Sequence, residues 1–387
     1  MVAREELIEE RGSHVPKMKG ARRAGSHADE DAHGRPIVVA VAERILTLRE
    51  LNRATLARQL LLERKKVGVL PAIERLAGLQ AQWPPSPYVG LWSRVAGFRR
   101  ESLERAILKG DVVKPTVMRG TLHLVTARDY PMFWWALRDM PTWYDDNHLA
   151  HALKAIDGAR KLAEAAPLTH KEGLAYLERE HGHTDDLTRR RIFHALRRRA
   201  HLLHVPESAL WSGRPLGVFH PHSEPEPIEV LAARTELVRR YLAAFGPSTR
   251  ADIADWSGLR VADFAAALEA LEPLRRFRDE NGRELLDLPR APLPPSDTPA
   301  PVRFLPKWDN TLLAHADRRR VLPEELRKAV IAKNGDVTQT FLVDGIVAGS
   351  WAADKKGKVT LMPFAPLPRS ARRDVDDEAA RLEAWLR

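Results

Sequence analysis

An order of elements recurs along the chain and restricts its fold: helical patterns are followed by a short pair of strand patterns. Apolar residues recur at helical spacing in eight segments, which are 48–62, 69–79 and 101–109, then 167–179 and 188–202, then 228–245, 250–256 and 261–271. The strand-like pairs that follow each group are 112–118 with 121–125, a pair within 202–218, and 274–278 with 284–288. Helices followed by a two-stranded ribbon form a winged helix-turn-helix, so the sequence predicts three such units in tandem.

A proline-rich segment, 291–301, separates these units from a C-terminal part of different character. Beyond it, strand patterns at 338–343, 346–353 and 359–364 have the spacing of a meander. An amphipathic pattern over 370–386 predicts a final helix. The predicted fold class is therefore α+β and mainly α, with a C-terminal β-rich subdomain.

The expected domain organisation follows from these boundaries. The N-terminal 36 residues are charged and lack apolar periodicity, which predicts an extension without fixed structure. The expected parts are an extension at 1–36, a first winged-helix unit at 37–160, a second at 161–226, a third at 227–292, and the C-terminal subdomain at 293–387.

Charge and composition limit the classes of function. Lys and Arg number 62 against 52 Asp and Glu, a net charge of +10. This excess indicates a nucleic-acid partner and an ordinary basic protein about equally. The chain has no cysteine, which excludes disulfides, thiolate metal sites and cysteine nucleophiles. No apolar run approaches the ~20 residues that span a bilayer, so we expect a cytoplasmic, nucleoid-associated protein without membrane contact.

The familiar catalytic motifs are missing: there is no Walker loop, dinucleotide fingerprint or nucleophile elbow. Two histidine pairs, His181 with His183 and His220 with His222, lack an obvious third ligand nearby. We therefore expect neither a metal nor a cofactor.

Gln80 and Gln82 follow the second helical pattern and precede a proline-rich turn, so we expect them at a helix end or in the loop after it. An amide is not a useful general base, but its carbonyl can hold a water while its NH₂ group donates. That suffices only where the leaving group is already activated, as in a purine made cationic by N7 or N3 alkylation. On the residues alone, two polar side chains at a helix end is the simpler interpretation.

A second polar set, Arg119, Thr121 and His123, lies in the strand-like run Met-Arg-Gly-Thr-Leu-His-Leu-Val at 118–125. Thr121 and His123 would share one face of a strand, because side chains alternate. Arg119 suits a phosphate contact as well as it suits an exposed wing turn. His123 is compatible with binding water or DNA and with a buried structural role. We interpret this run and the glutamines as two walls of one pocket.

These stretches resemble the bacterial winged-helix DNA glycosylases that remove alkylated purines and unhook interstrand crosslinks, the AlkZ-like group. The resemblance is carried in order by the segments 51–62, 78–82, 118–125, 307–315 and 341–345, and it extends over roughly 45–364. It implies three tandem winged helices in a C shape, and a catalytic Gln-x-Gln pair that matches Gln80 and Gln82. A sister branch has an acid at the second position, so Gln82 places this chain on the crosslink-unhooking side. Trp308 departs from the smaller or phenylalanine-like residue expected before Asp309 and Asn310.

Other candidates are less specific to this chemistry. Asp309 and Asn310 suit the same cleft, or an Asx turn, which the residues favour slightly. The 189–199 helix carries six arginines, including Arg190 and Arg197, with few acids nearby, which favours contact with a DNA backbone over a solvated face. Five aromatic residues lie close together in the sequence, and such a group is more typical of a core than of a platform for base stacking. They are Phe133, Trp134, Trp135, Trp143 and Tyr144.

The resulting expectation is a monomeric, monofunctional DNA glycosylase whose partner is double-stranded DNA with alkylated or crosslinked purines. Gln80 and Gln82 would place the water, and no lysine beside them suggests a Schiff-base lyase. A non-catalytic DNA-binding regulator is the main alternative, because winged helices alone would support it. An RNA- or nucleotide-binding module is disfavoured by the lack of RNA-binding signatures.

Overall fold

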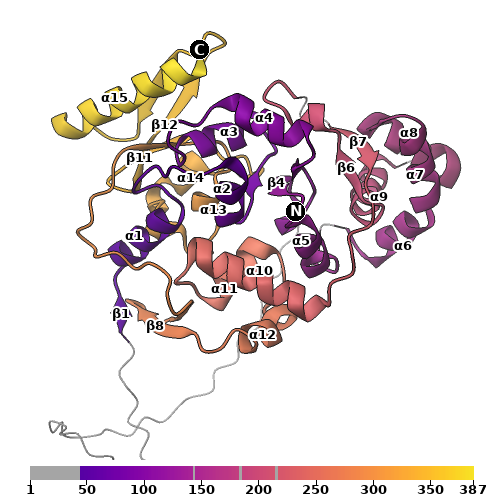
Figure 1. Ribbon diagram of the computed structural model, residues 1–387, viewed down its shortest axis with the longest axis horizontal. Helices are drawn as coiled ribbons and strands as arrows, with labels where there is room; N and C mark the ends of the chain where they lie inside the picture. Colours follow the sequence, from indigo (N-terminus) through magenta and orange to yellow (C-terminus); the bar gives the residue numbers. More distant parts are fainter. Residues whose placement is uncertain (1–43, 143, 183–184, 214–216) are drawn as a thin grey trace, which may run out of the picture. The chain divides into compact units, whose positions relative to one another are not determined.

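The computed structural model describes residues 44–142, 144–182, 185–213 and 217–387, and Glu43–Arg387 forms one compact unit. The predicted extension at 1–36 lies outside the described residues, as do Trp143 and His183. The described fold is α+β and rich in helix, as predicted, with four small sheets in the part of the chain that is described (Figure 1).

The first sheet has the strand order β2-β4-β3 and is antiparallel. One expectation is wrong here: Gln80 lies in a strand that pairs with β4, because the helix before it ends at Arg75. The prolines after Gln82 do not continue the preceding helix, as predicted, but they begin a new one, α3, that was not predicted. Proline suits the first turn, where the missing N–H would have no partner. The elements are α1 (Leu48–Arg58), α2 (Val69–Arg75), β2 (Leu79–Gln80), α3 (Pro85–Trp92), α4 (Arg100–Leu108), β3 (Val112–Val113) and β4 (His123–Thr126).

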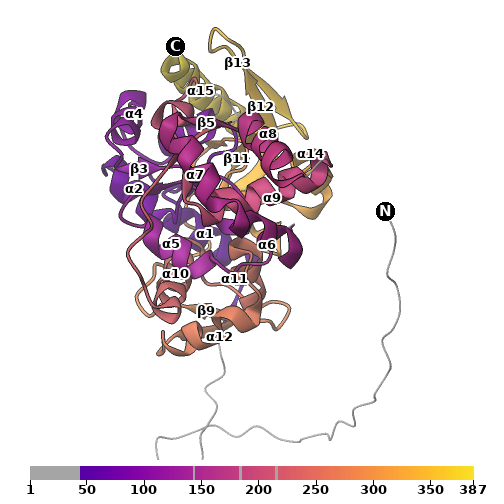
Figure 2. The ribbon, with the colours of Figure 1, turned by 90° about the vertical axis from the view of Figure 1, so that its right-hand side faces the viewer.

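The second sheet has the order β5-β7-β6 and adjoins a group of helices that Figure 2 shows together. The basic helix α9 packs against α6 and α8. Helix α8 was predicted, whereas α6 and the next helix, α7, were not. The elements are α5 (Tyr130–Leu137), α6 (Asp146–Lys154), α7 (Ile156–Ala165), β5 (Leu168–Thr169), α8 (His170–His181), α9 (Asp186–Arg199), β6 (Leu202–His204) and β7 (Val218–Pro221).

The third sheet confirms the predicted hairpin, whose turn has Gly282 at a φ of 77°. It also takes in a strand from the start of the described chain, β1, which pairs parallel with β8. The helix α11 begins with the capping box of Thr249 and Asp252. The elements are β1 (Ile45–Leu46), α10 (Val230–Phe245), α11 (Arg250–Ser257), α12 (Val261–Glu269), β8 (Arg275–Asp279) and β9 (Glu284–Asp287).

The C-terminal part is the predicted meander, a four-stranded sheet of order β10-β11-β12-β13. The final helix packs on β10 and β13 (Figure 1), and its Trp385 lies 4.6 Å from the Arg100 guanidinium of α4. The elements are β10 (Arg303–Leu305), α13 (Asn310–Leu313), α14 (Arg327–Val330), β11 (Thr340–Val343), β12 (Ile346–Ala353), β13 (Val359–Pro363) and α15 (Arg369–Leu386).

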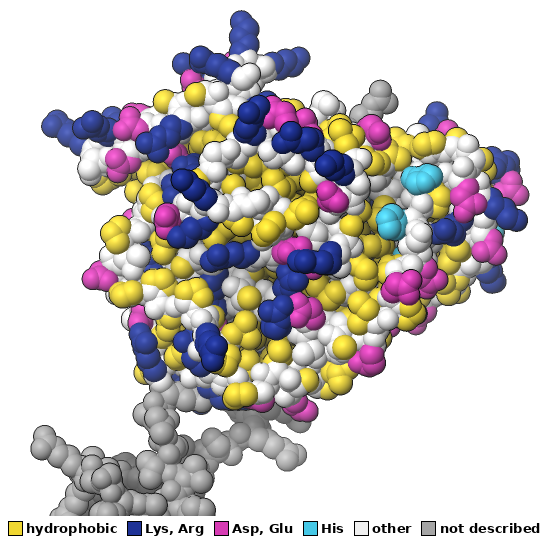
Figure 3. Space-filling view, in the orientation of Figure 1, with side chains coloured by type: hydrophobic (Ala, Val, Ile, Leu, Met, Phe, Trp, Pro, Cys, Tyr) yellow, Lys and Arg dark blue, Asp and Glu magenta, His cyan; other side chains and the backbone are white. Residues whose placement is uncertain are grey.

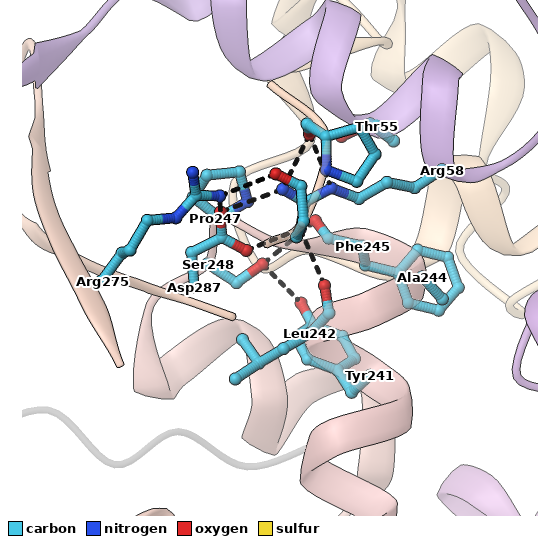
Figure 4. Close-up of polar contacts among 12 residues, drawn as sticks. Thr55, Arg58, Tyr241, Leu242, Ala244, Phe245, Pro247, Ser248, Arg275 and Asp287 are labelled. Atoms are coloured by element: carbon cyan, nitrogen blue, oxygen red, sulfur yellow. Dashed lines mark hydrogen bonds and ion pairs between the residues drawn. The ribbon is translucent and has the colours of Figure 1, made fainter. Parts of the chain in front are cut away.

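A buried ion pair joins α1 to α10 and β9 (Figure 4). Arg58 donates to both carboxylate oxygens of Asp287, over 2.7 and 3.0 Å, and to the carbonyl of Leu242 over 2.8 Å. Arg275 donates to the same carboxylate from β8. Neither Arg58 nor Asp287 is more than 1% exposed, so the charge of each is stabilised by the other instead of by water.

Candidate active site

The two stretches that the sequence singled out lie side by side. Strand β2 pairs with β4, so that Gln80 stands opposite His123, and the amide of Ala81 donates to the carbonyl of Leu122 over 2.8 Å. Opposite residues of an antiparallel pair present their side chains on the same face. The expected proximity of the glutamines to His123 is therefore confirmed.

A chain of hydrogen bonds runs from Arg119 through both glutamines. Arg119 Nη2 donates to Gln80 Oε1 over 2.8 Å, and Gln80 Nε2 donates to Gln82 Oε1. A guanidinium has only donors, so Gln80 must turn its oxygen to Arg119 and its nitrogen to Gln82. Gln80 is 6% exposed and Gln82 is half-buried. Thus Arg119 fixes the direction of both amides. The amide nitrogen of the more accessible one, Gln82, has no acceptor among the described residues and remains available as a donor.

The backbone brings Arg119 to this position at some cost. The residue has a φ of 55°, in the left-handed region, within the short 3-10 turn Met118–Gly120. For a residue other than glycine, such a conformation costs on the order of 1 kcal/mol and persists only where surrounding contacts impose it. Those contacts are the carbonyl of Trp256, 2.7 Å from Nη1, and Gln80.

No carboxylate of the described residues accepts a hydrogen bond from Arg119, although the charge of Asp255 acts on it favourably and that of Arg318 opposes it. Within the described residues, its hydrogen bonds go only to uncharged oxygens, the weakest being Asn310 Oδ1 at 3.5 Å. Burial lowers the pKa of Arg119 to about 10, which still leaves it cationic at neutral pH. A half-buried cation beside Gln80 therefore has capacity for an anion.

His123 is fully buried and uncharged. Its Nδ1 lies 3.1 Å from the carbonyl of Thr121, so Nδ1 carries the proton and Nε2 is an acceptor, without a partner among the described residues. Burial and the nearby Arg119 lower the pKa of His123 to about 3. The Thr121 hydroxyl donates to the carbonyl of Met118 over 3.0 Å and closes the turn.

Asp309 and Asn310 have different positions. Asp309 is buried against Arg94, 2.8 Å away, and accepts from the amide of Thr311 over 2.9 Å, the local turn that the sequence favoured. Asn310 reaches the site instead: its Nδ2 lies 3.3 Å from the carbonyl of Gly78. Both residues and Gln80 line a cavity of about 10 Å³, close to the size that one water needs.

More of the α9 arginines form ion pairs or contact aromatic rings than the sequence suggested. Arg190 is exposed and pairs with Asp186 at 2.7 Å, whereas Arg197 is half-buried with its guanidinium 4.9 Å from the Phe219 ring. Burial lowers the pKa of Arg197 to about 10. The expectation that few acids lie nearby is wrong, since these pairs also exist: Arg189 with Glu178, and Arg199 with Asp139. Arg190 remains accessible, because an exposed pair is weak.

Phe133 and Trp134 belong to the core, as expected, and Trp135 and Tyr144 pack against it partly buried. Phe133 is 1% and Trp134 9% exposed, and the Trp134 and Trp135 rings meet edge to face at 4.8 Å. Trp134 also donates to the carbonyl of Arg198 over 3.1 Å. The sequence reasoning missed the carbonyls of Trp256 and Gly78 at the site, because backbone groups carry no sequence signal.

Acid should destabilise this protein because it buries neutral histidines. Burial lowers the pKa to about 3 in His123, about 4 in His201 and about 3 in His315. The unfolded chain takes up these protons below about pH 6.5, whereas the folded chain does not. Stability is therefore complete above that pH and is lost below it, by about 1.4 kcal/mol per pH unit and histidine. Urea unfolding between pH 7.5 and 5 measures this slope.

His201→Asn provides the control for that slope. Residue 201 has a φ of 50°, which asparagine tolerates better than most residues. The variant should lose the equivalent of one proton from the slope. A slope that is flat, or that the substitution leaves unchanged, would contradict the expectation.

No group of three or more His, Cys, Asp or Glu side chains among the described residues is placed to hold a metal ion. None of the helices within those residues has the length and apolar character of a membrane span.

Comparisons with known proteins identify the family of the chain. The family model "DNA glycosylase AlkZ-like" matches residues 73–385. A curated relative, the "Interstrand DNA cross-link repair glycosylase" of Streptomyces sahachiroi, is 24% identical over 359 residues, covering 84% of this chain and 92% of the relative. The solved structure of Streptomyces sahachiroi DNA glycosylase AlkZ matches the fold with a TM-score of 0.71 and 21% identity, over 88% of this chain and 97% of that one. The chain therefore belongs to the AlkZ-like family of DNA glycosylases, enzymes of DNA repair.

Proposed function

We propose that this glycosylase hydrolyses the N-glycosidic bond of cationic purines of the N7-alkylguanine type, with Gln80 and Gln82 placing the attacking water. The observation that carries the proposal is the hydrogen-bond chain from Arg119 through Gln80 to Gln82. The chain consists of one guanidinium, which only donates, and two neutral amides, and the adjacent His123 stays uncharged. Such a site offers no strong acid for the departing base, which suits a base that already carries positive charge.

The charge of Arg119 points to a further contact with the DNA. A guanidinium beside the glutamines would oppose the positive charge that develops on the sugar when the base leaves. A DNA phosphate against the guanidinium removes this conflict and also fixes the register of the strand. We therefore assign Arg119 two tasks, orienting Gln80 and binding a phosphate next to the lesion, with Asn310 beside it.

The proposal extends to double-stranded DNA and to crosslinks. The relative from Streptomyces sahachiroi is named for interstrand crosslink repair, and its sequence aligns with this chain over 92% of its length. We propose that the three sheets with their neighbouring helices are winged-helix units in a C-shaped arrangement, within the boundaries expected from the sequence, and that a monomer binds the duplex. The exposed Arg190 of α9 would contact the backbone, and Arg197 would do so less, because it stacks on Phe219.

Base release from three duplexes tests the substrate: one with N7-methylguanine, one with a nitrogen-mustard crosslink and one undamaged. We expect release from the first, an abasic product without strand cleavage, and no release from the third. Separation of the strands of the second would establish crosslink unhooking. Failure to release N7-methylguanine would contradict the proposed substrate.

The two glutamines should tolerate a carboxylate very differently. Gln82 accepts a hydrogen bond from Gln80, and glutamate can accept it too, so Gln82→Glu should keep base release within about tenfold. Gln80 must accept from Arg119 and donate to Gln82, which a carboxylate cannot do. Gln80→Glu would also pair with Arg119, so its rate should fall by about 100-fold or more. Single-turnover rates on N7-methylguanine duplex measure both, and equal losses would contradict the hydrogen-bond chain.

A further inference from the structure

A second hollow, unrelated to the glutamines, lies between α10 and the segment that follows β9. It has a volume of about 740 Å³ and is mostly apolar, with Leu271, Leu288 and Pro292 among its lining residues. Arginines complete its wall, and no aspartate or glutamate lines it. Figure 3 shows Lys and Arg side chains over the region of α10, interspersed with acidic and apolar side chains. We call this hollow, lined by Arg75, Arg239, Leu271, Leu288, Arg290 and Pro292, the α10 groove.

The α10 groove faces away from the active site across α10. Tyr241 and Phe245 of this helix pack against the ring of Trp256, whose carbonyl holds Arg119. Arg239 and Ala243 line the groove. A helix turns about 100° per residue, so residues 239 and 243 point to the side opposite 241 and 245. The groove is thus a separate surface from the one that holds the glutamines.

The arginines of the groove differ in whether their charge is already matched. Arg58, at its base, is paired with Asp287, and Arg239 pairs with Glu236 on the same helix. The side chains of Arg75 and Arg290 are exposed and make no hydrogen bond or ion pair within the described residues. Two unmatched cations therefore stand at the edge of an apolar floor.

This combination selects the chemistry of an occupant. Leucine and proline side chains offer nothing to a phosphate backbone, so a duplex would leave the floor unused. Apolar surface of this extent is worth burying, at about 25 cal/mol per Å², and patches of this kind commonly mark protein contacts. An occupant that satisfies both features has leucine- or phenylalanine-type side chains between aspartates or glutamates.

We propose that the α10 groove binds a short acidic segment of a partner protein, with its apolar side chains on Leu271, Leu288 and Pro292 and its carboxylates on Arg75 and Arg290. The site lies outside the catalytic region, so it would connect the glycosylase to another protein while the glutamines engage DNA. The proposal does not depend on which lesion is the substrate.

Binding of four labelled 12-residue peptides to the full chain, followed by fluorescence anisotropy, tests the proposal. One peptide alternates Glu with Leu and Phe; the others replace the apolar residues by Ser, the acids by Lys, or the acids by Gln. Only the first should bind in the micromolar range, and its affinity should fall as salt rises. Equal binding of the lysine peptide, or no binding of the first peptide, would overturn the proposal.

Charge reversal locates the binding. The double substitution Arg75→Glu and Arg290→Glu should lower the affinity for the acidic peptide at least tenfold. The rate of base release from a short duplex should stay within twofold of that of the unaltered protein. The matched control is Arg372→Glu with Arg373→Glu, two exposed arginines of α15, which should leave the peptide affinity unchanged. If the first double variant instead weakens the binding of undamaged duplex DNA and leaves the binding of the peptide unchanged, the groove is a DNA contact and the proposal is wrong.

Discussion

Replacing Gln80 by alanine should lower the single-turnover rate of base release from N7-methylguanine duplex by about 100- to 1000-fold, the range seen when one oriented hydrogen-bonding group is removed from an active site. The loss has two physical sources. Gln80 no longer holds the water, and the link between Arg119 and Gln82 is broken, so the second amide also loses its orientation. Binding of the same duplex should change by no more than about threefold, because a phosphate contact of Arg119 does not require the amide.

The control for Gln80→Ala is Gln339→Ala, because the Gln339 side chain makes no hydrogen bond within the described residues and lies just before β11. Its rate should equal that of the unaltered protein. The double variant Gln80→Ala with Gln82→Ala should be little slower than Gln80→Ala alone, since the two amides act as one unit. Losses that multiply would mean that each glutamine acts separately, and an unchanged rate for Gln80→Ala would remove the catalytic assignment.

Replacing Asp287 by alanine should lower the free energy of unfolding by about 3–5 kcal/mol, the cost of leaving a buried charge without its partner. Arg58 is 1% exposed and would keep only carbonyl acceptors, that of Leu242 (Figure 4) and that of Pro292. Since these contacts hold α1 against α10, the loss should affect the whole compact unit. Urea unfolding followed by circular dichroism measures the change.

Two comparisons make the result for Asp287→Ala specific. Glu324→Ala removes an exposed pair with Arg327, whose atoms are 3.4 Å apart, and should cost less than about 1 kcal/mol. Arg58→Met combined with Asp287→Leu removes both charges and should recover part of the stability. A loss for Asp287→Ala no larger than that for Glu324→Ala would show that the buried pair contributes little.

The long amphipathic helices and the meander could be predicted from the sequence, because their periodicity follows from burying one face. Helix α10 and strand β12 begin or end within two residues of the predicted segments. The short elements could not be predicted. Strand β2 has two residues and forms only because β4 lies beside it, and β1 pairs with β8 across more than 200 residues of chain. Helix α3 was not predicted, because the prolines that end the preceding helical pattern also occupy the first turn of the next helix.

The sequence by itself determined the candidate groups: the Gln-x-Gln pair, the polar run at 118–125, and the absence of cysteine. It could not determine their roles. Only the tertiary structure decided that Arg119 orients Gln80, that Asp309 is used by Arg94, and that several arginines of α9 are already paired or stacked. The physical reason is that hydrogen bonds and ion pairs depend on distances of about 3 Å between groups far apart in the chain. Local residue patterns specify which groups exist, whereas packing decides which of them meet.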